Sequence, residues 1–232
     1  MFTFAHDSDL HYGKTRLDPR RLKDSHPKKI IESDAEFVIL TGDLTDNGYN
    51  DAHIGCIHYG GHGKQLSTFM RRYVKPLEEA DREVFMCAGN HDRGKRLWKI
   101  NIYPAVHHLI KKKYGGLNYT FERKGLYFVC CHEYPKNINW LKKQLKDIRQ
   151  PTIIFFHFNL EGPHSDWWNN KAKDAFYDAI KDYKVVALLF GHHHISKVGE
   201  WRGIKTISSS NAYSLITYDQ YTEDIVGVKH VR

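Results

Sequence analysis

Short apolar runs alternate along this sequence with longer amphipathic stretches, and this alternation limits the folds open to the chain. The apolar runs predict buried strands at six places, Phe2–Ala5, Glu36–Leu40, Glu83–Ala88, Leu126–Cys131, Thr152–Phe156 and Lys184–Phe190. The amphipathic stretches predict four helices, Leu66–Ala80, Ile100–Tyr114, Asn139–Ile148 and Lys171–Tyr183. Pro76 predicts a kink or an early stop in the first helix, and residues 205–231 predict strands joined by a turn. Strands and helices that take turns in this way predict an α/β fold.

No repeat, low-complexity tract or proline-rich linker divides the 232 residues, so we expect residues 1–232 to form a single domain. Aromatic residues make up 13% of the chain, which excludes a disordered protein. The longest apolar run, residues 185–190, is much shorter than the roughly 20 residues that cross a membrane. The N-terminus lacks the pattern of a signal peptide, and four cysteines are too few for a disulfide framework. We therefore expect a cytoplasmic protein without a membrane span.

The formal net charge of +8 suits an anionic partner. The basic residues are scattered along the chain in small groups, at residues 28–29, 71–72, 111–113 and 142–143. Such groups are typical of solvated helix faces rather than of a continuous nucleic-acid surface. The sequence therefore favours a small phosphorylated substrate, leaves nucleic acid open as a partner, and gives no indication of the oligomeric state.

Polar clusters follow the predicted strands, at the strand ends where open α/β sheets bind their ligands. The clusters are Asp9–His11, Gly-Asp-Leu-Thr-Asp-Asn-Gly at 42–48, Gly-Asn-His-Asp at 89–92, His157, and Gly-His-His-His at 191–194. Carboxylate and amide oxygens mixed with imidazole nitrogens suit borderline metals such as Mn, Fe or Zn. Extended backbone would place Asp9 and His11 on one side, and likewise His192 and His194. Asp43, beside Gly42, is the natural bridge between two metals.

Each of these residues also has a simpler structural reading. Asp9, Asp43 and Asn90 could cap turns or helices, His157 could be a core histidine, and residues 191–194 could form a solvated loop. Taken together they favour a metal centre. Carboxylates and imidazoles that converge would repel one another or stay unsatisfied without a cation.

The five clusters, in this order over residues 9–194, resemble the motifs of the calcineurin-like metallophosphoesterase superfamily. The resemblance implies a two-sheet β-sandwich flanked by helices, and two divalent or trivalent metal ions, with manganese favoured over iron or zinc. It implies one metal held by Asp9, His11, Asp43 and His194, and a second held by Asp43, Asn90, His157 and His192. It also implies that His91 contacts the phosphate or protonates the leaving group, and that Asp46 orients His91.

The same resemblance implies hydrolysis of phosphate esters by a metal-activated hydroxide with a histidine general acid. The motifs at 42–48 and 89–92 are similar to those of phosphodiesterase-type members, which include cyclic-nucleotide hydrolases, so a phosphodiesterase is favoured over a phosphatase. Three positions depart from related groups: protein phosphatases carry Arg at the place of Asn47, repair nucleases tend to carry His at that of Asp46, and relatives often carry a second His at that of Phe158. A metal-dependent nuclease and a non-catalytic scaffold are the alternatives.

Two segments flank the predicted centre. Residues 159–168 precede a helix that Ser165 or Asp166 could cap. In the same segment, Trp167 and Trp168 could anchor the loop or stack on a base, and we favour anchoring. The glycine-rich segment 48–63 contains His53, His58 and His62, and a solvent-exposed loop is favoured there over substrate contacts. The other histidines, His6, His26, His107, His108, His132, His164 and His230, are given no role.

Overall fold

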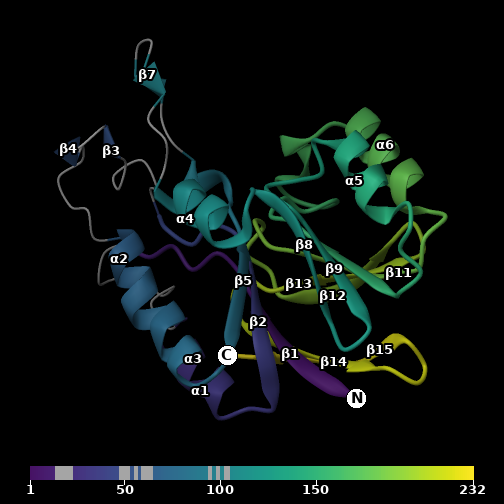
Figure 1. Cartoon of the computed structure of the whole chain (residues 1–232), viewed down its shortest axis with the longest axis horizontal. Coiled ribbons are helices and arrows are strands. Elements are labelled where there is room, and N and C mark those ends of the chain that lie inside the picture. Colours follow the sequence, from purple (N-terminus) through teal and green to yellow (C-terminus); the bar gives the residue numbers. More distant parts are fainter. Residues whose placement is uncertain are drawn as a thin grey trace.

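The computed structural model describes residues 1–13, 23–46, 53–54, 57–58, 65–93, 96–97, 100–101 and 105–232. Two β-sheets pack against each other, with helices on their outer sides (Figure 1). The first sheet has the order β15-β14-β1-β2-β5. Its strands are β1 (Phe2–Asp7), β2 (Ala35–Thr41), β5 (Glu83–Cys87), β14 (Tyr213–Asp219) and β15 (Asp224–Val231). Strands β1, β2 and β5 are parallel, so their carboxyl ends lie at one edge.

The second sheet has the order β12-β13-β11-β10-β9-β8. Its strands are β8 (Asn118–Arg123), β9 (Leu126–Cys131), β10 (Thr152–Phe155), β11 (Val185–Phe190), β12 (Lys197–Trp201) and β13 (Ile204–Ser208). The four central strands are parallel, and the outer strands β8 and β12 are antiparallel to their neighbours. Two small hairpins complete the strands, β3 (His53–Ile54) with β4 (Ile57–His58), and β6 (Arg96–Leu97) with β7 (Ile100–Asn101).

Aromatic side chains fill the space between the two sheets. Phe4 of β1 stacks on Phe37 of β2 with ring centroids 5.1 Å apart, and both meet Phe128 of β9 edge to face, at 5.7 and 5.5 Å. All three side chains are buried. Because buried aromatic rings contribute large apolar areas and packed pairs add to them, this contact joins the two sheets into one core.

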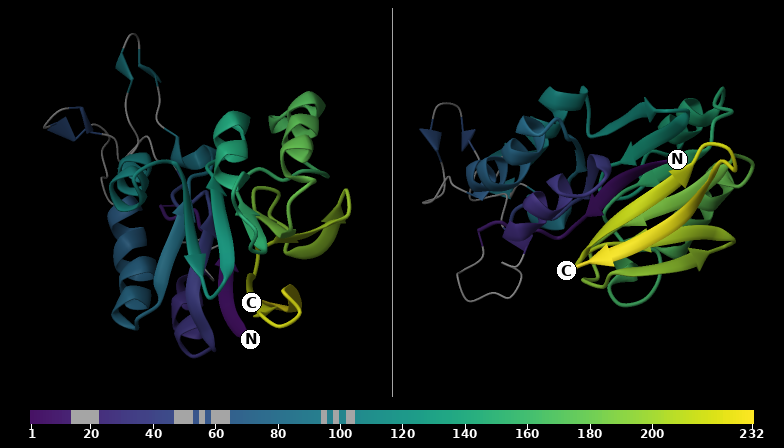
Figure 2. Two further views of the ribbon diagram at one scale, coloured as in Figure 1. Left: turned by 45° about the vertical axis from the view of Figure 1, so that its right-hand side comes forward. Right: turned by 90° about the horizontal axis from the view of Figure 1, so that it is seen from below.

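Helices cover the outer side of each sheet, as Figure 2 shows from two further directions. On the first sheet lie α1 (His26–Ile31) and a continuous helical run made of α2 (Gln65–Phe69), the π-helical η3 (Met70–Val74) and α3 (Lys75–Glu79). On the second lie α5 (Ile138–Leu145) and α6 (Asn170–Ile180), which bury Leu141, Leu145 and Phe176 in a second core. Further helical segments are α4 (Ala105–Tyr114) and the 3-10 turns η4 (Asn90–Asp92) and η5 (Ser165–Trp167). None of the helices in the described ranges is long and apolar enough to span a membrane.

The structure confirms the predicted α/β sandwich of two sheets and corrects several details. The first long helix does not stop at Pro76 but continues to Glu79, because the wider π turn comes first and Pro76 enters at the start of α3. Of the predicted helix at residues 100–114, Ile100–Asn101 lie in strand β7 instead, and Ala105–Tyr114 form helix α4. Neither Ser165 nor Asp166 caps α6. Asn169 does, because its side chain accepts a hydrogen bond from the Ala172 amide at 2.9 Å.

Candidate metal centre

Five loops meet where parallel strands from both sheets end. Backbone hydrogen bonds tie the first two loops together, from the Asp9 amide to the Gly42 carbonyl at 3.0 Å and from the His11 amide to the Asp43 carbonyl at 2.9 Å. The loops after β10 and β11 are tied in the same way, since the Gly191 amide donates to the His157 carbonyl at 3.1 Å. The carboxyl ends of the strands therefore bring together residues that lie far apart in the sequence.

Five of the seven predicted ligands have a left-handed backbone conformation. Their φ angles are 54° for Asp9, 48° for His11, 50° for Asp43, 74° for His192 and 57° for His194. The expectation that extended backbone aligns each pair is therefore wrong. Left-handed residues at both ends of each three-residue segment turn the chain instead. Such conformations are costly outside glycine and cluster at functional sites, so their concentration here indicates a site held in place by its surroundings.

Asp9, His11 and His194 form one group of converging ligand atoms, which all lie within 4.8 Å of one another. His194 Nε2 lies 3.4 Å from Asp9 Oδ1 and 3.3 Å from His11 Nε2. His11 Nε2 also lies 3.7 Å from Asp43 Oδ2. The structure therefore brings together the four side chains of the first predicted metal position.

Asp43, His157 and His192 form a second such group. His157 Nε2 lies 3.3 Å from Asp43 Oδ2, 3.0 Å from Asn90 Oδ1 and 3.2 Å from His192 Nδ1. All four side chains of the second predicted metal position meet here. Asp43 belongs to both positions, as a bridging carboxylate would.

Ionisable side chains are concentrated in the buried part of the candidate metal centre. Asp9, Asp43 and His157 are almost fully inaccessible to solvent. Burial lowers the pKa of His157, but the nearby carboxylates of Asp43 and Asp9 outweigh it and raise that pKa to about 9. Burial raises the pKa of Asp43, but His157 beside it brings the pKa below its usual value. The carboxylates thus favour a positive charge within the centre. The nitrogen and oxygen donors of the centre together fit a pair of borderline metal cations.

Neighbouring groups fix the orientation of these ligands. His157 Nδ1 lies 2.7 Å from the Thr41 carbonyl oxygen and must donate to it, which leaves Nε2 to face Asp43 and Asn90. Asp9 Oδ2 accepts hydrogen bonds from the Ser210 hydroxyl at 2.6 Å and from the His192 amide at 2.9 Å. Such partners set ring orientation and tautomer, as they do around metal ligands in general.

His91 lies at the edge of the centre and is partly exposed. Its Nδ1 lies 2.7 Å from the backbone carbonyl oxygen of Asp46 and 4.0 Å from the Asp46 carboxylate. The Asp46 carboxylate is closer to His11 Nδ1, at 3.3 Å. Asp46 is thus placed to orient His91 mainly through its backbone rather than through its side chain. A ring nitrogen of His91 also lies within 4.8 Å of ligand atoms of His11 and Asp43, so His91 belongs to the same cluster of side chains.

Two positioning residues were not recognised in the sequence. Asp92 is buried, and its carboxylate accepts hydrogen bonds from the amides of Leu44, Thr45 and Gly89 at 2.9 to 3.0 Å, which clamps the loops of Asp43 and Asn90 together. Its place in Gly-Asn-His-Asp was a signal for it. Lys23 is buried as well and donates to the carbonyl oxygens of Ser8 and Asp9. No motif pointed to Lys23.

His107, His132 and Glu133 form a further group of side chains with ligand atoms close together. Glu133, however, already accepts hydrogen bonds from Arg93 Nη2 at 2.7 Å and from Lys136 Nζ at 2.9 Å. Two cations thus compensate this carboxylate, and a metal ion there would be repelled by both. In the glycine-rich segment, His62 lies outside the described residues, and only the backbones of His53 and His58 are described.

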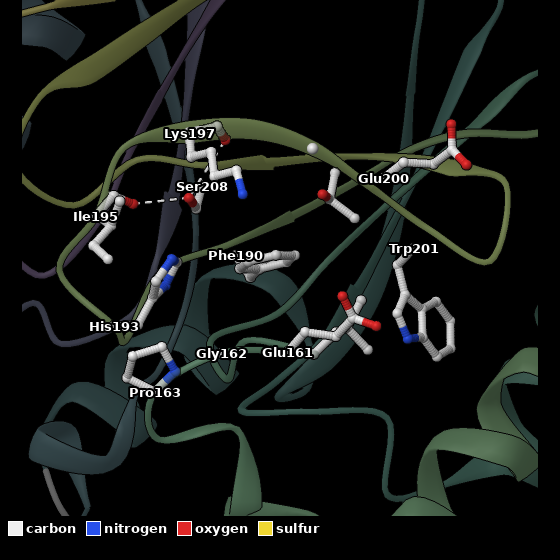
Figure 3. Close-up of a pocket in the computed structure, with 13 residues that line it drawn as sticks. Glu161, Gly162, Pro163, Phe190, His193, Ile195, Lys197, Glu200, Trp201 and Ser208 are labelled. Carbon is white, nitrogen blue, oxygen red and sulfur yellow. Dashed lines mark hydrogen bonds between the residues drawn. The ribbon is translucent and has the colours of Figure 1, made fainter.

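His193 faces a different place from its two neighbours. It lines a pocket of about 280 Å³ together with Phe190 and Trp201, shown in Figure 3. Its Nδ1 lies 3.0 Å from the Gly191 carbonyl oxygen. The middle histidine of residues 192–194 is therefore turned away from the candidate metal centre.

The chain is similar in sequence or in fold to several known proteins. The chain is 22% identical over 193 residues to the 3',5'-cyclic adenosine monophosphate phosphodiesterase CpdA of Haemophilus influenzae; the match covers 78% of this chain and 64% of that protein. Among solved structures it is similar to a dimetal phosphatase from Danio rerio, with a TM-score of 0.63 and 12% identity over 94% of this chain and 93% of that one. It is also similar to the phosphopantetheinyl hydrolase PptH of Mycobacterium tuberculosis, with a TM-score of 0.54 and 14% identity over 90% and 89% of the two chains.

These two solved structures support the fold, and the family follows from the sequence itself. The pattern of the calcineurin-like phosphoesterase family matches residues 2–196, which include all five clusters of the candidate metal centre. The chain therefore belongs to the calcineurin-like phosphoesterase family.

Proposed function

We propose that this protein hydrolyses phosphate esters with two metal ions, and that it prefers phosphodiesters to phosphomonoesters. Asp9, His11, Asp43 and His194 would hold one ion, and Asp43, Asn90, His157 and His192 the other, with manganese as the first choice and iron or zinc as the alternatives. The observation that carries this proposal is the position of Asp43, whose Oδ2 lies 3.7 Å from His11 Nε2 and 3.3 Å from His157 Nε2. A carboxylate between two imidazole groups is the arrangement that a metal pair requires.

When bound, two such ions acidify a water molecule and neutralise the charge that builds on the phosphoryl oxygens. The chain's own residues do the rest. His91 Nδ1 donates to the Asp46 carbonyl, which fixes the ring, and in the protonated imidazole Nε2 carries the proton that the leaving oxygen takes up. Proton transfer of this kind is typically worth about 10² to 10⁴ in rate.

Two observations support a small phosphodiester as substrate, and a third supports a cytoplasmic location. The related CpdA is named as a cyclic AMP phosphodiesterase, although this chain spans only 64% of its length. The net charge of +8 favours a small phosphorylated substrate. Cys87, Cys130 and Cys131 are free and buried, which suits a reducing compartment.

The test is Mn²⁺-dependent turnover of bis-p-nitrophenyl phosphate and of p-nitrophenyl phosphate. The parent protein should hydrolyse both, the diester faster. Asp43→Asn should abolish turnover, because the bridge loses its charge, whereas Asp147→Asn, at an exposed position of the same residue type, should not. His91→Ala should retain the metal and lose about 10² to 10⁴ in kcat. Loss of metal from His91→Ala would make His91 a ligand.

Full activity of Asp43→Asn, or no turnover of either ester by the metal-loaded parent, would overturn the proposal. The second result would favour a scaffold. Cleavage of single-stranded DNA in preference to both esters would favour a nuclease.

A further inference from the structure

An exposed tryptophan stands directly beside the second metal position. Trp167 is 45% exposed, although it is among the largest apolar side chains. One face of its indole stacks on Phe158, with ring centroids 5.1 Å apart and an angle of 19° between the planes. Its ring also meets His192 edge to face at 5.5 Å and 89°. Phe158 thus packs against one face of the indole. The exposed part of the indole lies next to His192, a predicted metal ligand.

Anchoring of the loop does not explain this exposure. The neighbouring Trp168 anchors the loop, because it is only 3% exposed and its Nε1 donates to the Asn159 carbonyl at 3.1 Å. Asn159 Nδ2 closes the loop further by donating to the carbonyls of Glu161 and Pro163. The preference for loop anchoring holds for Trp168, and Trp167 remains available for another role.

A fixed positive charge lies against the same rings. The Arg93 guanidinium is 5.6 Å from the ring centroid of Trp167 and 5.7 Å from that of Phe158. Its Nε and Nη2 both donate to the Glu133 carboxylate, which is only 2% exposed and holds the planar group in one orientation. The Arg93 side chain is 39% exposed, and within the described part of the chain no hydrogen bond is found for its Nη1.

Together these groups offer a flat apolar surface and an oriented N–H donor side by side. Aromatic side chains take nucleobases by stacking, and an arginine already fixed by a carboxylate can donate its remaining N–H groups to a phosphate oxygen. A nucleotide presents both features, a planar base and a phosphoryl group, whereas simple alkyl phosphodiesters present only the second.

We infer that Trp167 and Arg93 form a substrate subsite that selects nucleoside phosphodiesters, with the base stacked on Trp167 and Arg93 Nη1 donating to a phosphoryl oxygen. This inference rests on the proposed function, since it names the substrate class of the same centre. Trp167 is a specificity-determining residue in this arrangement, and Glu133 is a positioning residue that acts through Arg93.

Two esters with the same leaving group separate the base from the chemistry. These are thymidine 5'-(p-nitrophenyl phosphate) and methyl p-nitrophenyl phosphate, assayed with the manganese-loaded protein. The expected result is that Trp167→Ala raises KM for the thymidine ester about tenfold or more relative to its effect on the methyl ester, because stacking on an aromatic side chain is lost. Trp167→Phe should restore most of the difference. Tyr221→Ala removes an aromatic side chain that is 95% exposed in the turn between β14 and β15, and should leave the ratio unchanged.

Arg93 is tested by a variant that keeps its charge. Arg93→Ala would leave the buried Glu133 carboxylate with less compensation and could unfold the loop, so Arg93→Lys is the better choice. A lysine cannot reproduce the planar fork, and we expect KM to rise for both esters by a similar factor, unlike the change at Trp167.

A binding measurement gives a readout apart from turnover. Titration with thymidine 5'-monophosphate should quench tryptophan fluorescence in the parent and much less in Trp167→Ala, while methyl phosphate should quench neither. Equal KM ratios and equal quenching in the parent and Trp167→Ala would overturn the subsite and leave the proposed function intact. Failure of the proposed function would appear instead as no turnover of either ester by the parent.

Discussion

Two glycines of the candidate centre, Gly89 and Gly191, lie where no side chain fits. A Cβ atom built on Gly191 would lie 2.5 Å from Asp9 Oδ2 and 2.7 Å from Ser8 Cβ. One built on Gly89 would lie 2.8 Å from His157 Nε2 and closer still to Asp43. These two glycines let the loops approach each other, so their lack of a side chain sets the distances between ligands that come from different strands.

We therefore predict that Gly191→Ala weakens metal binding about 10- to 100-fold, the range seen when groups that orient metal ligands are changed. The added methyl group would displace the Asp9 carboxylate. Gly227→Ala is the matched control, because a Cβ atom there would make ordinary contact with Thr217 at 3.5 Å. Calorimetric titration with Mn²⁺ measures the affinity. Parent-like affinity in Gly191→Ala, with its circular dichroism unchanged, would show that Asp9 does not depend on this close approach.

The sequence predicted which side chains of the centre come together but not how the backbone brings them together. Asp9 and His11 were grouped by assuming an extended chain, yet both are left-handed. The grouping was right because a left-handed residue at each end of the segment also turns both side chains toward one place. The role of the Asp46 backbone could not be predicted either. It depends on how the loop of Asp46 meets the loop of His91, and the spacing of the motifs does not show that contact.

At the scale of helices and strands, buried parallel strands were easy to predict and edge elements were not. Strands β9 and β10 are continuous apolar runs because both of their faces are covered. Strand β8 at one edge of the second sheet and β12 at the other carry charged residues among apolar ones, and neither was predicted. The six-residue helix α1 was missed as well, because it is too short to show a helical period.

Helix α4 contacts the end of β9 through a pair of half-buried histidines. His107 and His132 lie with ring centroids 4.9 Å apart, and His107 Nε2 and His132 Nδ1 are buried without a hydrogen-bond partner in the described residues. Burial lowers the pKa of His107 to about 4 and that of His132 to about 3. Both imidazoles are therefore neutral in the folded protein at pH values where the unfolded chain already binds protons.

This pair predicts a loss of stability in mild acid. Well above pH 6.5 neither state is protonated at His107. As the pH falls through 6.5 toward about 4, the unfolded state binds a proton and the folded state does not, so the free energy of unfolding decreases. For His107 alone the loss between pH 7 and pH 5 is about 1 to 2 kcal/mol. We expect the thermal midpoint of His107→Gln, measured on metal-free protein, to fall less over this interval than that of the parent.

His108→Gln is the control, because His108 follows on the same helix but is exposed. It should show the same dependence on pH as the parent protein. If His107→Gln and His108→Gln lose stability equally between pH 7 and pH 5, the pair of His107 and His132 does not contribute to acid sensitivity.

At the scale of the whole molecule, the candidate metal centre is built from residues of both sheets. Asp9, Asp43 and Asn90 follow strands β1, β2 and β5 of the first sheet, whereas His157 and His192 follow β10 and β11 of the second. The aromatic core joins the same sheets through Phe4, Phe37 and Phe128. Metal ions held between ligands of both sheets would thus add a second connection, one that the unfolded chain does not have.

We therefore predict that manganese stabilises the fold as a whole. At a free Mn²⁺ concentration about 100 times the dissociation constant, binding at one site adds about 2.7 kcal/mol to the free energy of unfolding. For a chain of this size that raises the thermal midpoint by roughly 5 to 10 °C, and EDTA should reverse the rise. Differential scanning calorimetry of the parent and of Asp43→Asn, with Mn²⁺ and with EDTA, measures both effects. Asp43→Asn should gain much less from the metal, because Asp43 is the side chain that both ligand groups share. An equal gain in the two proteins would mean that manganese stabilises the chain from some other place, and the connection between the sheets would then rest on the aromatic core alone.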